Sequence, residues 1–142
     1  NISLYCNLAI IFLSQTTQSM AHSINWFEIP VSDFDRAKAF YETVLGAEMG
    51  EFEAMGMRSA FFPADMQNGE ISGCLIQGEG YEPSTSGSLV YLNGGEDLST
   101  PLSKIENAGG KVLLPKTSIG PNGFMAYFSD TEGNKVGLHS MK

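Results

Sequence analysis

Two residues of the sequence are well suited to acid–base chemistry: Glu28, near the start of the patterned region, and His139, near its end. A carboxylate among apolar walls has a raised pKa and can act as a general base or accept a hydrogen bond. A histidine can donate to a ligand, or pair with Glu28 as a base with its orienting partner. Both residues also fit structural roles, and His22 carries less weight because it precedes the first predicted strand.

Three further residues are placed beside these two by strand alternation. Trp26 shares a strand face with Glu28, and serves either as a cavity wall or as a platform for a planar ligand. Tyr91 and Asn93 share the face of Leu89 on a later strand, although Asn93 also suits a strand end and Tyr91 a packing position. The candidate ligand-binding residues are therefore Trp26, Glu28, Tyr91, Asn93 and His139, and the tentative catalytic residues are Glu28 and His139.

A strand and a helix between residues 24 and 46 position the first of these residues. Phe27, Ile29 and Val31 form an apolar strand face that can pack on the helix. Asp33 occupies an N-cap position and Gly46 a C-terminal stop. Between them, apolar side chains recur at helical spacing: Phe34, Ala37, Phe40, Tyr41, Val44 and Leu45.

The same order of elements then recurs, with a period of about 63–65 residues. Strands are expected over residues 24–31, 47–55, 57–63 and 71–77 in the first half, and over 88–93, 111–118, 123–129 and 135–141 in the second. The second helix should have Thr100 as its cap and Pro101 at its first position, and should end at Gly109. We therefore predict two βαβββ modules: about 22–78 and about 88–142, joined by a linker over 79–87. A concave space between them, the trough, suits a small molecule.

The overall composition excludes some partners and limits others. A net charge of −8 over 142 residues, with eight basic residues in no cluster, argues against nucleic acid and against an anionic membrane surface. Cys6 and Cys74 form no metal-binding or disulfide pattern, which favours a reducing, cytoplasmic setting. Residues 1–21 differ in character from the rest of the chain. Their apolar run has no basic residue before it, so we interpret them as a leader or a mis-assigned start.

Three stretches together resemble the vicinal oxygen chelate superfamily, the glyoxalase/bleomycin-resistance/dioxygenase group. They are FEIPVSDFDRAKAFYETVLG, then VYLN followed by an acidic helix entry, then AGGKVLLPKTSIGPNGFMAYFSDTEGNKVGLHS. The resemblance covers the chain from residue 24 onward. It implies an α+β fold of paired βαβββ modules with a central cavity that holds a divalent metal or an apolar ligand, commonly in a homodimer.

The metal positions that the resemblance implies are not occupied by metal-binding residues. The first-strand positions fall on Trp26 and Leu89, and the last-strand positions fall on Gly137 and near Ser72 or Gly73. A divalent metal needs several convergent nitrogen, oxygen or sulfur donors, which tryptophan, leucine and glycine lack. We therefore predict no metal ligand and no cofactor, although these positions alone do not exclude a divalent metal.

Three functions follow as hypotheses. The first is a binding protein that holds a small organic molecule in the trough without a metal. The second is an enzyme of the same superfamily, a lyase, epimerase or dioxygenase-like protein that uses Glu28 and His139. The third is an interaction module whose trough is filled by its own side chains.

Overall fold

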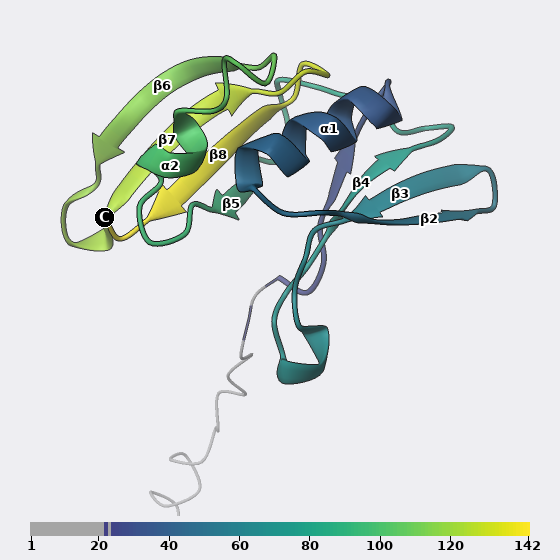
Figure 1. The fold of residues 1–142 in the computed structure, drawn as a ribbon, viewed down its shortest axis with the longest axis horizontal. Coiled ribbons are helices and arrows are strands. Elements are labelled where there is room, and N and C mark those ends of the chain that lie inside the picture. Colours follow the sequence, from purple (N-terminus) through teal and green to yellow (C-terminus); the bar gives the residue numbers. More distant parts are fainter. Residues whose placement is uncertain (1–21, 23) are drawn as a thin grey trace, which may run out of the picture.

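The computed structural model describes residue 22 and residues 24–142, so the prediction for residues 1–21 lies outside the described part. The chain forms two four-stranded sheets, with strand orders β1-β4-β3-β2 and β5-β8-β7-β6. Figure 1 shows the two sheets side by side, with α1 lying across the region where they meet. The predicted α+β architecture of two βαβββ modules is confirmed. In the described residues, no helix combines the length and apolar character needed to span a membrane.

Module one contains β1 (Glu28–Pro30), α1 (Phe34–Leu45), β2 (Gly50–Ala54), β3 (Met57–Phe61) and β4 (Cys74–Gln77), with a 3₁₀ turn η2 (Met66–Asn68) before β4. Asp33 caps α1 by accepting the amide of Arg36, and Gly46 ends the helix in the left-handed region. The predicted cap and stop are therefore confirmed. β1 is shorter than the predicted strand, and Trp26 precedes it.

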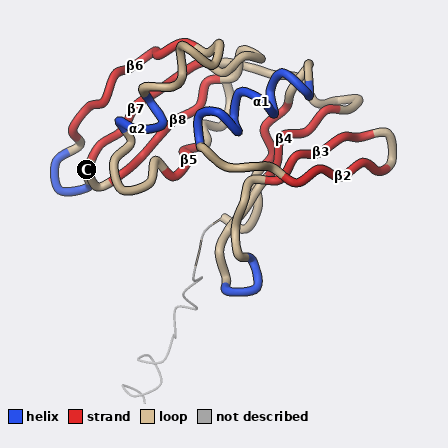
Figure 2. Tube along the Cα trace, viewed as in Figure 1, coloured by secondary structure: helices blue, strands red, loops and turns tan. Residues whose placement is uncertain are grey.

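Module two contains β5 (Tyr91–Asn93), α2 (Ser99–Leu102), β6 (Lys111–Ser118), β7 (Phe124–Ser129) and β8 (Lys135–Ser140), with a 3₁₀ turn η3 (Gly120–Asn122) after β6. Figure 2 shows how little helix this module has beside its strands. The predicted cap at Thr100 is wrong. The helix begins two residues earlier, at Ser99, with Leu98 at the cap position and the amide of Ser99 donating to the side chain of Asp97. After Leu102, i→i+3 bonds replace the helix.

One hydrophobic core joins the two modules. Ile29 and Leu75 of the first sheet and Leu138 and Phe128 of the second belong to the same buried cluster as the inner face of α1. The ring of Phe40 on α1 lies 6.0 Å from that of Phe128 on β7. Because α1 packs on both sheets, it fixes how the two halves sit against each other.

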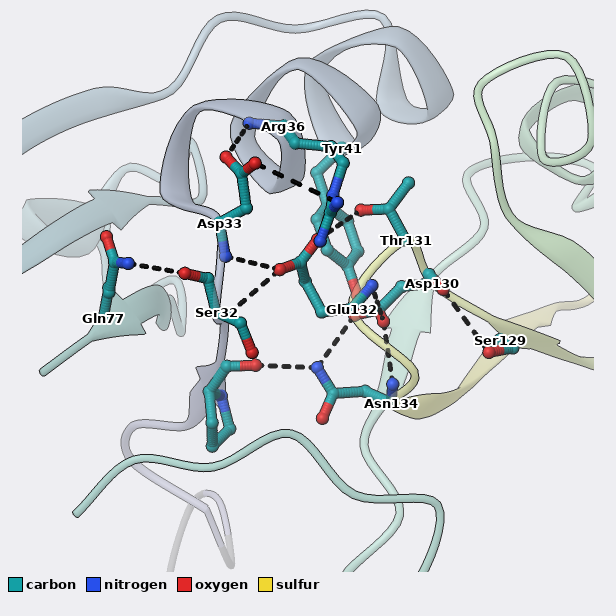
Figure 3. Close-up of polar contacts among 11 residues, drawn as sticks. Ser32, Asp33, Arg36, Tyr41, Gln77, Ser129, Asp130, Thr131, Glu132 and Asn134 are labelled. Carbon is teal, nitrogen blue, oxygen red and sulfur yellow. Dashed lines mark hydrogen bonds and ion pairs between the residues drawn. The ribbon is translucent and has the colours of Figure 1, made fainter. Parts of the chain in front are cut away.

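The turn between β7 and β8 forms hydrogen bonds with the start of α1 (Figure 3). The side chain of Glu132 has no exposed surface, and its carboxylate accepts the amides of Ser32 at 3.0 Å and Asp33 at 2.6 Å. Arg36 Nε donates to the other carboxylate oxygen at 2.8 Å. Burial raises the pKa of Glu132, but these donors together with Thr131 outweigh it and lower the pKa overall. An acid from module two thus fills the electropositive end of a module-one helix.

Two neighbours of Glu132 extend this junction. Buried Asp130 accepts the hydroxyl of Tyr41 at 2.8 Å, and burial together with this carboxylate raises the pKa of Tyr41 well above its usual value. The amide nitrogen of buried Asn134 donates to the carbonyl of Pro30 at 2.7 Å. The turn at residues 130–134, DTEGN, therefore joins the two modules through polar contacts.

Candidate functional site

The face of the second sheet that is turned away from the core carries an aromatic cluster. Cross-strand pairing places Tyr91 of β5, Gly137 of β8 and Tyr127 of β7 in one row. The ring of Tyr91 lies directly on Gly137, since a Cβ added there would stand 2.5 Å from its Cδ1 atom. Glycine is therefore required at this position for the tyrosine ring to lie flat against the sheet.

The two tyrosines hold each other in place. Their hydroxyl oxygens lie 2.6 Å apart, and that of Tyr127 also lies 3.6 Å from the sulfur of Met125. This hydrogen bond, with partial burial and the neighbouring phenol, raises the pKa of Tyr91 to about 12. Lys135 places its ammonium group 4.5 Å from the centre of the Tyr127 ring, a cation–π contact. The two rings, joined through their hydroxyl groups, therefore present a fixed aromatic wall.

A hollow of about 540 Å³ opens beside this wall, and we call it the tyrosine hollow. Its floor includes three predicted ligand-binding residues, Tyr91, Asn93 and His139. The remaining lining residues are Leu92, Gly95, Ile119, Met125, Ser140 and Met141. His139 Nε2 lies 2.8 Å from the carbonyl oxygen of Asn122, which holds the ring in place. The structure thus brings these three predicted residues together.

The two other predicted residues lie elsewhere on the chain. Trp26 is 37% exposed and packs on Phe61, with 5.8 Å between ring centres. Glu28 lines a smaller hollow of about 180 Å³ at the seam between the modules. Interaction with this carboxylate raises the pKa of the Tyr81 phenol in the linker. Within one chain, Glu28 and His139 therefore do not share a hollow.

A larger hollow of about 630 Å³, the inter-module hollow, separates part of module one from β5. Apolar side chains of Ile24, Phe27 and Phe62 line one side. Tyr91 and Asn93 line the other side and belong to the tyrosine hollow as well. The two hollows therefore adjoin at β5, and both are mostly apolar.

The metal positions implied by the family do not fit a metal in this chain. The space that a side chain at Gly137 would need is filled by the ring of Tyr91, and that at Gly73 by the ring of Phe27. The position in module one that corresponds to Gly137 was predicted at Ser72 or Gly73. Strand pairing places it at Cys74 instead, because Cys74 lies opposite Glu28 as Gly137 lies opposite Tyr91. Within the described residues, no three His, Cys, Asp or Glu side chains converge as a metal site would require.

Cys74 itself offers little chemistry. The residue is 2% exposed, and burial together with the charge of Glu28 raises the pKa of its thiol. A raised pKa keeps the thiol protonated and therefore weakly nucleophilic.

Met125 and Tyr127 were not among the site residues predicted from the sequence. Alternation along β7 could have found both, because Met125 and Tyr127 are two residues apart and face the same side as Gly137 and His139. The contact between Tyr91 and Gly137 had no comparable sequence pattern.

The chain belongs to the Glyoxalase/Bleomycin resistance protein/Dioxygenase superfamily, whose family model matches residues 23–138. This confirms the resemblance drawn from the sequence. A glyoxylase-like domain-containing protein of Didymella fabae is 32% identical over 117 residues, which cover 78% of this chain and 88% of that relative.

Two further similarities are informative about architecture. A putative glyoxylase of Mycobacterium bovis is 26% identical over 80% of this chain, but the chain matches only 44% of that protein's length. The crystal structure of TnmS3, an antibiotic binding protein from Streptomyces sp. CB03234, is 29% identical with a TM-score of 0.60 and covers 86% of this chain and 98% of that one. Both support the same superfamily assignment.

Proposed function

We propose that this protein binds a small, planar organic molecule at the tyrosine hollow without the help of a metal. The observation that carries the proposal is the ring of Tyr91 lying on Gly137, because it puts an aromatic wall where the family's metal ligand would stand. The wall is pre-organised by the bond between Tyr91 and Tyr127, so little ordering is needed when a ligand stacks on it. The similarity to an antibiotic-binding protein supports the same class of function.

The adjoining inter-module hollow gives such a ligand room. It is larger and mostly apolar, and it shares Tyr91 and Asn93 with the tyrosine hollow. A fused-ring compound could therefore stack on Tyr91 and extend between the modules while its polar edge stays near Asn93 and His139.

We also propose that a second copy of the chain closes the site. Trp26 and Phe52 are 37% and 59% exposed, and Phe52 lies 6.5 Å from Phe61, which in turn packs on Trp26. An exposed aromatic row on a sheet face is typical of a surface that is covered in an assembly. Light scattering coupled to size exclusion should give the mass of a homodimer; a monomer mass at micromolar concentration would contradict this.

The binding proposal is tested by titration with 1-hydroxyanthraquinone, a planar neutral quinone, followed by calorimetry and by the methyl resonance of ¹³C-labelled Met125. We expect that resonance to shift and Tyr91→Ala to weaken binding at least tenfold, because stacking on the ring is lost. Met66→Ala is the matched control, since Met66 is exposed and lies outside the tyrosine hollow. Equal binding by Tyr91→Ala would contradict the site.

The absence of a metal is tested separately. Titration with Zn²⁺, Ni²⁺, Mn²⁺ and Fe²⁺ should show no tight site of one ion per chain. A stoichiometric site that is lost on mutation of a residue in the hollow would overturn this part of the proposal.

The enzymatic alternative with Glu28 and His139 has less support. The two side chains line different hollows in one chain, and Nε2 of His139 is already bonded to a backbone carbonyl. The alternative predicts a substrate whose turnover falls in both Glu28→Gln and His139→Ala, and unchanged turnover in both would exclude it.

A further inference from the structure

The ring of His139 has a defined pattern of donor and acceptor. Its Nε2 atom lies 2.8 Å from the backbone carbonyl oxygen of Asn122. A carbonyl oxygen only accepts hydrogen bonds, so Nε2 carries the hydrogen and donates. In the neutral imidazole the other nitrogen, Nδ1, is then an acceptor, and no described residue donates to it.

Asn93 supplies the complementary donor. Its Oδ1 atom accepts the backbone amide of Gly95 at 2.9 Å, which fixes the orientation of the side-chain amide. Its Nδ2 group is left as a donor without a partner among the described residues. Asn93 and His139 are direct partners in the parallel pairing of β5 with β8. Neighbouring strands lie about 4.8 Å apart, so one small polar group can reach both side chains.

The rest of the tyrosine hollow is uncharged. No Lys, Arg, Asp or Glu side chain lines it. The nearby ammonium of Lys142 is already paired with Glu96 at 2.6 Å. A carboxylate or phosphate placed here would lose water without gaining a cation, which is unfavourable. The aromatic face of Tyr91 and the thioether of Met125 instead favour a flat apolar ring.

We infer that the tyrosine hollow takes a neutral planar ligand whose edge carries an N–H donor beside a C=O acceptor, as in a cyclic amide or imide. The ligand N–H donates to Nδ1 of His139, the ligand carbonyl accepts from Nδ2 of Asn93, and the ring lies against Tyr91. This inference rests on the proposed binding function and specifies the chemical class of the ligand.

Three related probes test the inference by calorimetry and the Met125 methyl resonance. They are 2-quinolone, a bicyclic lactam; N-methyl-2-quinolone, which lacks the donor; and quinoline-2-carboxylate, which is anionic. The lactam should bind at least tenfold more tightly than either of the others, since each leaves a polar group of the site unpaired or a charge unmatched.

One variant separates hydrogen-bonded recognition of the lactam from nonspecific hydrophobic binding. Asn93→Asp keeps the oxygen that accepts from Gly95 but replaces the Nδ2 donor with an acceptor, so it should weaken lactam binding at least tenfold without a change in melting temperature. Asn25→Asp is the matched control, because Asn25 is exposed and lines a different hollow. Its affinity should stay within twofold of the wild-type value.

The outcomes distinguish this inference from the broader proposal. Equal binding of the N-methyl probe, tighter binding of the carboxylate, or an unaffected Asn93→Asp variant would overturn the assignment of ligand class. If 2-quinolone fails to bind while the quinone shifts the Met125 methyl, the ligand class is wrong and the binding function stands. If neither compound shifts it, both are wrong.

Discussion

Removal of the Glu132 carboxylate should weaken the contact between module two and the start of α1, and so lower the free energy of unfolding. In Glu132→Ala, the amides of Ser32 and Asp33 lose an acceptor that is closed off from water. A hydrogen bond to a charged group contributes about 1.5–3 kcal/mol, and solvent can replace part of it at a helix end. The ion pair with Arg36 adds little, because the arginine side chain is 53% exposed. We therefore expect a loss of about 2–4 kcal/mol.

Urea unfolding followed by circular dichroism measures this loss, which corresponds to a drop in melting temperature of roughly 8–16 °C for a domain of this size. Arg36→Ala should lower the free energy of unfolding by much less than Glu132→Ala does, because the guanidinium group is exposed. Glu48→Ala is the control for loss of an exposed glutamate and should stay within about 0.5 kcal/mol. If Glu132→Ala is no worse than Arg36→Ala, the backbone amides are not the main partners and the reasoning fails.

The effect should also depend on pH in a defined direction. The pKa of Glu132 is lowered in the folded protein, so its contribution is fully present above the ordinary carboxyl pKa of about 4.3 and is lost as pH falls through the lower folded value. Glu132→Gln resembles the protonated acid. The difference between wild type and Glu132→Gln should therefore be largest near pH 7 and shrink below about pH 4. A difference that grows in acid would contradict this sign.

Three other changes test the site and the core. Tyr127→Phe removes the bond that raises the pKa of Tyr91 to about 12, so ultraviolet titration should show Tyr91 ionising closer to pH 10; an unchanged titration would mean another cause. Gly137→Ala places a methyl group against the Tyr91 ring and should destabilise the fold by about 1–3 kcal/mol in urea, and no loss would mean the ring moves freely. Tyr41→Phe leaves buried Asp130 one donor short and should lower the free energy of unfolding by about 1–3 kcal/mol, whereas a gain in stability would refute a structural role for this hydroxyl.

Local sequence rules predicted α1 and most strands correctly for physical reasons. The cap at Asp33, the stop at Gly46 and the apolar spacing between them all act within a few residues, so they can be recognised without tertiary information. The same local rules predicted the start of the module-two helix incorrectly. Its start is set by Asp97, while the amide of Leu98 is bonded to Ser140 of β8, a partner that sequence spacing does not reveal.

For the candidate site too, local rules placed residues on a strand but could not tell which strands and modules meet. Alternation correctly placed Tyr91 and Asn93 on one strand face, and His139 joins them because β5 pairs with β8. The expectation that a trough would bring Glu28 opposite His139 depended on how the modules pack, and in one chain these residues line separate hollows. Whether either residue is catalytic stays a prediction.

The sequence by itself determined the family, the two-module α+β fold and the absence of donor side chains at three implied metal positions, Trp26, Leu89 and Gly137, because each depends on residue type and local spacing. Only the tertiary structure decided what replaced those donors. The ring of Tyr91 fills the space above Gly137. The carboxylate of Glu132 accepts the amide of Ser32, about a hundred residues earlier in the sequence, and so joins the two modules. Both depend on contacts between distant strands and loops, which follow from packing and not from local pattern.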